Sequence, residues 1–182
     1  MIRTRKILRH KYLDYSNNRK YFITICTKYR INHFGEIKNN KMFYSDIGLI
    51  AREYLETIPR HFIFCEIDSF VVMPNHVHMV VVLNEYVGVA HGRPNDFGMT
   101  NNRDADRRPL QLQNPMNVSI PKIINHYKGS VTRIVQNEFN NFDFQWQRSY
   151  HDHIIRNDHE LNRIQIYINH NILNWNKDIN NK

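Results

Sequence analysis

Aromatic and β-branched residues gather in three short segments in the first half of the chain. Residues 21–27, 66–72 and 76–83 are each rich in them, which predicts three buried strands. Residues 73–75 (Met-Pro-Asn) have the chemistry of a tight turn. The second and third strands are therefore predicted to form an antiparallel hairpin.

Three other segments carry apolar residues at the helical period. Ser45 precedes the first segment and Pro59 marks its end, whereas Ser119 precedes the second. The third helix is predicted to begin near Asn157 or Asp158. Its core stripe consists of Leu161, Ile164, Ile168, Ile172 and Trp175.

A further strand is predicted at residues 150–156, between the second and third helices. The order of elements is then strand, helix, strand, strand, helix, strand and helix. This order is typical of an α+β protein with a ferredoxin-like split β-α-β antiparallel sheet, with helices packed on one face and an added C-terminal helix.

Two segments lie outside this pattern. Residues 1–20 hold seven Lys and Arg residues against one acid, and residues 84–118 are a long loop that contains glycine and proline. A connection of this length inside a compact domain is typically functional or disordered. We predict a basic N-terminal arm (1–20), followed by a single domain (21–182) that carries the loop.

Composition narrows the class of protein. The 182 residues suffice for one domain with a proper core, and the net charge of +8 favours polyanionic partners. Apolar runs such as residues 79–83 are too short to cross a membrane, and no secretory signal is recognised. With only Cys26 and Cys65, far apart, we expect a cytoplasmic protein with reduced thiols.

His76 and His78 alternate along the third predicted strand, so both imidazoles project from the same face of the sheet. Buried imidazoles need partners, which a metal ion or hydrogen-bonding neighbours can supply. The spacing alone leaves both interpretations open, because the chain has 11 histidines and His151 and His153 repeat the pattern.

Three blocks resemble the REP-associated tyrosine transposases, a group of the single-tyrosine HUH transposases. Residues 70–80 (Phe-Val-Val-Met-Pro-Asn-His-Val-His-Met-Val) resemble the HUH segment. Residues 146–157 resemble the second block of that group, and residues 167–171 (Tyr-Ile-Asn-His-Asn) its catalytic helix. The three blocks stand in the family's order, which makes the match more specific than any single block.

The resemblance implies an enzyme that cuts and rejoins single-stranded DNA, at hairpin-forming repeats, through a 5′-phosphotyrosine intermediate. It implies His76, His78 and Asn171 as ligands of a divalent metal, Mg²⁺ or Mn²⁺, and Tyr167 as the nucleophile. His153 and His170 are possible further neighbours of this site. The enzyme would be cytoplasmic, nucleoid-associated when bound to DNA, and either a monomer or a homodimer.

The residues themselves agree with these roles. Tyr167 and Asn171 are four apart, hence on one face of the last helix. A phenol with a pKa of about 10 is a poor nucleophile at neutral pH, and a metal can compensate by stabilising the leaving oxygen. Tyr127 is the main competitor, but it falls within the apolar stripe of its own helix and is predicted to be core.

Cations distributed over the chain are candidates for contacts to DNA phosphates. Two alternatives to a strand transferase remain: a non-catalytic single-stranded nucleic-acid-binding module of ferredoxin-like fold, and a metal phosphodiesterase that uses water. The candidate DNA contacts are Arg3, Arg5, Lys6, Arg9, Lys122, Lys128, Arg133, Arg148 and Arg156.

Overall fold

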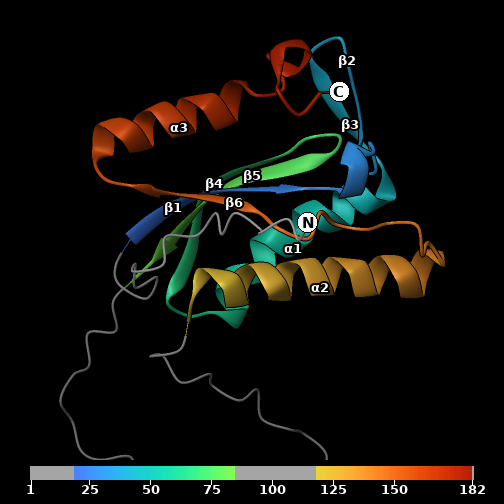
Figure 1. Cartoon of the computed structure of the whole chain (residues 1–182), viewed down its shortest axis with the longest axis horizontal. Coiled ribbons are helices and arrows are strands. Elements are labelled where there is room, and N and C mark those ends of the chain that lie inside the picture. The colour runs from blue at the N-terminus through green and yellow to red at the C-terminus, as the bar shows by residue number, and fades with distance from the viewer. Residues whose placement is uncertain (1–18, 85–117, 182) are drawn as a thin grey trace, which may run out of the picture.

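A four-stranded antiparallel sheet forms the centre of the molecule (Figure 1). The structure is a computed structural model that describes residues 19–84 and 118–181. The strands lie in the order β4-β5-β1-β6. This arrangement confirms the predicted α+β fold. The strands are β1 (Arg19–Cys26), β4 (Cys65–Val72), β5 (His76–Leu83) and β6 (His151–Ile155).

The helices lie on both faces of this sheet (Figure 1). α1 (Asp46–His61) and α2 (Ile120–Phe139) cover one face, and the added C-terminal helix α3 (Asp158–His170) covers the other. A short 3₁₀ turn, η3 (Trp175–Lys177), follows α3.

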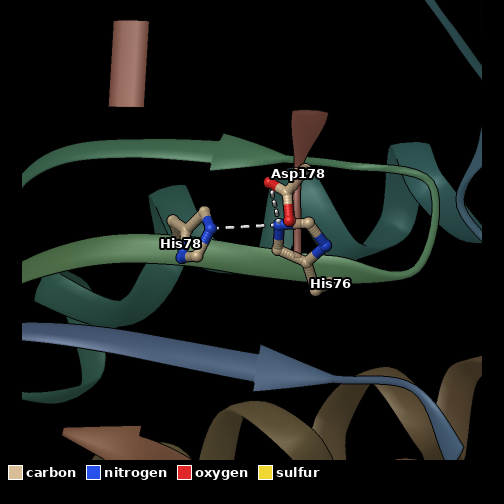
Figure 2. A group of neighbouring side chains, drawn as sticks. All are labelled: His76, His78 and Asp178. Carbon is tan, nitrogen blue, oxygen red and sulfur yellow. Dashed lines mark hydrogen bonds and ion pairs between the residues drawn. The ribbon is translucent and has the colours of Figure 1, made fainter. Parts of the chain in front are cut away.

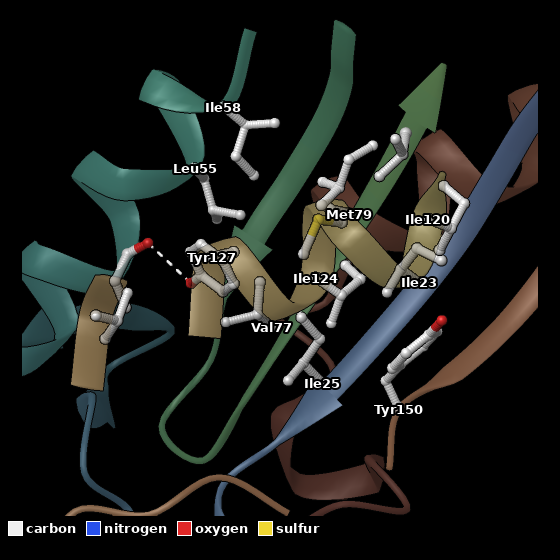
Figure 3. Packing of buried hydrophobic residues seen from close by; sticks show 14 of the residues in the cluster. Ile23, Ile25, Leu55, Ile58, Val77, Met79, Ile120, Ile124, Tyr127 and Tyr150 are labelled. Atoms are coloured by element: carbon white, nitrogen blue, oxygen red, sulfur yellow. Dashed lines mark hydrogen bonds between the residues drawn. The ribbon is translucent and has the colours of Figure 1, made fainter. Parts of the chain in front are cut away.

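Alternation along β5 explains how the two faces differ. Val77 and Met79 belong to the larger core beneath α1 and α2, where Figure 3 shows them beside Leu55 and Tyr127. Val80 instead packs in a smaller cluster that includes Leu161 and Ile168 of α3. His76 and His78 share the parity of Val80, so the fold directs both imidazoles to the face that α3 covers.

Two of the three predicted N-caps make their side-chain bond, whereas Ser119 stands at the N-cap of α2 without one. Ser45 Oγ accepts a hydrogen bond from Gly48 N–H (3.1 Å), and Asn157 Oδ1 accepts one from Glu160 N–H (2.8 Å). The prediction that α1 ends at Pro59 is wrong by two residues, because α1 runs to His61. A proline in the last turn removes only one backbone bond, which the packing of α1 on the sheet outweighs.

The sequence did not predict a second, two-stranded sheet. β2 (Gly35–Lys38) and β3 (Lys41–Tyr44) form a hairpin whose turn residues, Asn39 and Asn40, both have positive φ (52° and 59°). Asparagine favours this turn, but strands of four half-exposed residues carry little hydrophobic pattern.

Several predictions fall outside the described residues. These are almost all of the basic arm, with Arg3, Arg5, Lys6 and Arg9, and the body of the long loop at 84–118. Among the residues that the structure describes, no helix is both long and apolar enough to span a membrane.

Candidate active site

Two histidines at the start of β5 form the centre of the site. Register places His76 opposite Cys26 and His78 opposite Thr24 of β1. The His76 side chain is fully buried and His78 is 3% exposed. Their Nε2 atoms are 3.0 Å apart, so the two rings converge on one point (Figure 2).

Asn75 determines which nitrogen of the neutral His76 ring carries the proton. The Asn75 amide group donates through Nδ2 to the carbonyl oxygens of Arg30 (3.1 Å) and Asn180 (2.9 Å). Its Oδ1 therefore faces His76 Nδ1, at 2.9 Å, and accepts a hydrogen bond from the Nδ1–H group. His76 Nε2 is left with a lone pair that points into the site.

The His78 ring has an adjustable partner. Its Nδ1 lies 2.8 Å from Thr24 Oγ1, and a hydroxyl can donate to that nitrogen or accept from it. When the hydroxyl donates, His78 Nε2–H can donate to His76 Nε2. When it accepts, both Nε2 atoms present lone pairs, which is the state that a cation requires.

Burial keeps both imidazoles neutral. Desolvation, assisted by the positive charge of Arg30, lowers the pKa of His76 to about 3. Desolvation and the neighbouring His76 likewise lower the pKa of His78 to about 3, against the opposing effect of Asp178. Neutral imidazole is the form that binds metal.

These lowered pKa values predict acid sensitivity. Below pH 6.5 the unfolded chain takes up protons that buried His76 and His78 cannot, so the free energy of unfolding falls between pH 6.5 and 3. Each imidazole contributes up to about 1.4 kcal/mol per pH unit in this window. Urea unfolding in EDTA at pH 7.5 and 5.5 measures the loss, which should shrink in the double variant His76→Gln, His78→Gln. An unchanged pH dependence in that variant would contradict the assignment.

Oxygen donors complete the cluster. Asp178, directly after η3, places Oδ2 3.7 Å from His76 Nε2, and its carboxylate and the two imidazoles lie within 4.8 Å of one another (Figure 2). Asn171 caps α3, and its buried Oδ1 has no hydrogen-bond partner among the described residues. Trp175 stacks on the His76 ring and supports this corner. Two neutral imidazoles and a carboxylate make a donor set that fits a divalent cation, and Asn171, which bonds to the Tyr167 side chain, adds an unpaired amide oxygen beside them.

Tyr167 reaches the same point from α3. Its hydroxyl lies 3.2 Å from His78 Nε2, and its ring packs against His78 and the edge of Phe22. The residue is 42% exposed, so its hydroxyl can meet both the cluster and a substrate. Desolvation, and then the charge of Asp178, raise the pKa of the phenol, which a hydrogen bond from Asn171 opposes. The phenol is therefore protonated at neutral pH.

The structure brings the four central predicted residues together and leaves others apart. Tyr127 is buried, its hydroxyl donates to the Ala51 carbonyl (2.9 Å, Figure 3), and burial raises its pKa, so it belongs to the core as predicted. The predicted neighbours His153 and His170 bond instead to Glu160 Oε1 (2.7 Å) and the Ile166 carbonyl (2.9 Å).

The predicted DNA-binding cations that the structure describes lie on different faces of the molecule. Lys122 and Arg133 are exposed on α2, which covers the opposite face of the sheet from α3. The Lys128 ammonium donates to the carbonyl oxygen of Gln147 (2.6 Å), so it braces the chain before β6. Arg148 and Arg156 are exposed on either side of β6.

Sequence reasoning missed four residues that shape the site: Thr24, Arg30, Asn75 and Asp178. Thr24 could have been found from the register of β1 on β5, and Asn75 from its position beside His76. Asp178 gave no signal, because a lone acid in an asparagine-rich segment has no local pattern that predicts where it folds.

Comparisons with known proteins agree with this geometry. Residues 102–171 match the family described as "Transposase IS200 like", and this stretch contains both Tyr167 and Asn171. A Haemophilus influenzae protein described as uncharacterized is 34% identical over 183 residues, covering 97% of this chain and 93% of that protein. The chain belongs to the IS200-like transposase family.

A solved structure shows that this transposase-family fold is shared more widely. The structure of a REP-associated tyrosine transposase bound to a REP hairpin superposes with a TM-score of 0.55. It is 17% identical, and the match covers 91% of this chain and 73% of that one. At this identity the likeness concerns the fold alone.

Proposed function

We propose that this transposase-family chain is a metal-dependent endonuclease and strand transferase. It cleaves and rejoins single-stranded DNA, at hairpin or repeat ends, through a 5′-phosphotyrosine link. One observation carries the proposal: the Tyr167 hydroxyl lies 3.2 Å from His78 Nε2, at a cluster of two neutral imidazoles and the Asp178 carboxylate. Membership of the family supports the same reading.

His76, His78 and Asn171 are the proposed metal ligands, with the Asp178 carboxylate within reach as a further donor. Bound Mg²⁺ or Mn²⁺ would neutralise charge on the scissile phosphate and stabilise the departing 3′ oxygen. Asn75 holds the His76 ring so that Nε2 points inward, and the Thr24 hydroxyl lets His78 do the same.

Tyr167 is the proposed nucleophile. Its oxygen attacks the phosphorus, a new bond joins phosphorus to the phenol, and the bond from phosphorus to the 3′ oxygen breaks. The phenol loses its proton, and the departing 3′ oxygen gains one and becomes a free 3′ hydroxyl. One ester replaces another, so a 3′ hydroxyl can attack the phosphotyrosine and rejoin the strand.

An assay with hairpin oligonucleotides in Mn²⁺ or Mg²⁺ tests this function. A substrate labelled on its 3′ side should give a protein–DNA adduct that survives denaturing gels, whereas one labelled at its 5′ end should give a free fragment. Cleavage with turnover and no adduct would replace the proposal with a phosphodiesterase. Binding without cleavage, insensitive to chelators, would replace it with a binding module.

The residues that orient the imidazoles give a further prediction. Asn75→Ala and Thr24→Val should each weaken Mn²⁺ binding by about 10- to 100-fold, because such partners fix the ring and raise ligand basicity. Isothermal titration calorimetry measures the change. Thr57→Val is a matched control, since the Thr57 hydroxyl donates to the Tyr54 carbonyl within α1, on the other face of the sheet. Unchanged affinity in both test variants would refute this role.

A further inference from the structure

A concave site lies beside the proposed active site. It is a pocket of about 510 Å³, within the usual range for ligand sites, lined by residues 27–30 and 145–148. Backbone bonds join the two segments: Lys28 N–H donates to the Gln145 carbonyl (2.7 Å), and Gln147 N–H to the Cys26 carbonyl (2.8 Å). The walls are therefore fixed to each other and to the end of β1.

The lining has a consistent chemical character. Lys28, Arg30 and Arg148 contribute positive charge, and the lining contains no acidic residue. Gln145 and Gln147 contribute side-chain amides, of which Gln145 Oε1 accepts a hydrogen bond from Lys28 Nζ (2.6 Å) and keeps its NH₂ group as a donor. This combination suits an anionic ligand that also carries hydrogen-bonding edges.

Tyr29 adds an aromatic surface in an unusual setting. Its side chain is 84% exposed, the most of any large hydrophobic residue that the structure describes as exposed. Tyr29 and Arg30 both have left-handed backbones, with φ of 56° and 57°. Consecutive non-glycine residues in this region cost free energy, and such strain is concentrated at functional sites.

The pocket connects to the active site through Arg30. The Arg30 carbonyl accepts a hydrogen bond from the side-chain amide of Asn75, the residue that orients His76. The Arg30 guanidinium donates to Asn180 Oδ1. Cys26, one residue before the pocket lining, pairs with His76 across the sheet. A single strand of DNA that passes the proposed catalytic centre can therefore continue over Arg30 into the pocket.

We propose that this pocket binds an unpaired nucleobase of the DNA strand that is cut. The base stacks on Tyr29, its phosphates face Lys28 and Arg148, and the amides of Gln145 and Gln147 contact its edge. Aromatic stacking combined with cations is the general mode of single-strand binding. The inference deepens the proposed function, on which it rests, by naming a substrate subsite and the residues that select a base.

Fluorescence of 2-aminopurine tests the inference without cleavage. The base analogue is placed at each position of the single-stranded flanks of a hairpin and titrated with the Tyr167→Phe protein in EDTA. At one position we expect quenching by stacking. Tyr29→Ala should abolish that quenching and weaken binding by about 5- to 150-fold, whereas Tyr29→Trp should retain both. Phe43→Ala, which removes an exposed aromatic on β3, is the matched control.

Salt dependence provides a second readout. Lys28→Gln and Arg148→Gln should each reduce the slope of log affinity against log salt by about 0.7, and Lys41→Gln on β3 should not. Equal affinity and quenching in Tyr29→Ala and its parent would overturn the inference, as would tighter binding of the matching RNA. DNA that binds through Tyr29 but yields no adduct in the wild-type protein overturns the proposed function and leaves the pocket standing.

Discussion

Tyr167→Phe should abolish the covalent protein–DNA adduct and reduce cleavage by about 10³-fold or more, because removal of a nucleophile eliminates the step itself. The phenyl ring keeps the contacts with His78 and Phe22, so the fold and the metal site should persist. Denaturing gels with 3′-labelled hairpin DNA measure the adduct, and Mn²⁺ titration checks that the site is intact.

Tyr150→Phe is the matched control for this experiment. Tyr150 is buried immediately before β6, so its replacement leaves the proposed nucleophile in place. Adduct formation should stay within a few-fold of wild type. An adduct that persists in Tyr167→Phe and disappears in Tyr150→Phe would reverse the assignment.

His78→Gln should reduce Mn²⁺ affinity by at least about 100-fold and adduct formation by about 10³-fold. Glutamine keeps a polar group of comparable size beside Thr24 but removes the ring nitrogen that converges with His76. Calorimetry measures the affinity, and circular dichroism confirms that the sheet is retained.

His153→Gln and His170→Gln are the controls, because both rings bond outside the cluster. Each variant should keep its metal affinity and cleavage within a few-fold of wild type. A loss in either control equal to that in His78→Gln would mean that the site extends beyond the residues assigned to it.

Local patterns explain which parts of the fold were predictable. The alternation of side chains along residues 76–83 predicted that both imidazoles project from the same face of the sheet. The spacing of Tyr167 and Asn171 predicted that they share one face of the helix. Both predictions depend only on residues within a single strand or helix. The capping residues Ser45 and Asn157 are equally local, and both bonds are present.

The features of the site that could not be predicted depend on contacts between segments that are distant in the sequence. Asn75 bonds to the carbonyl of Asn180, 105 residues away, and Asp178 meets His76 only after the chain has returned past α3. The ammonium of Lys128, a predicted phosphate contact, donates to the carbonyl of Gln147, a partner that the sequence did not predict. Propensity and periodicity do not encode such partners, because tertiary packing chooses them.

Peptide mass spectrometry of the trapped protein–DNA adduct tests the central claim most directly. Wild-type protein is incubated with Mn²⁺ and a hairpin substrate, digested with protease and nuclease, and the residual nucleotide is located on its peptide. The account predicts a single 5′-phosphoryl linkage on Tyr167. A linkage on any other residue, or cleaved DNA with no linkage to protein, would contradict it.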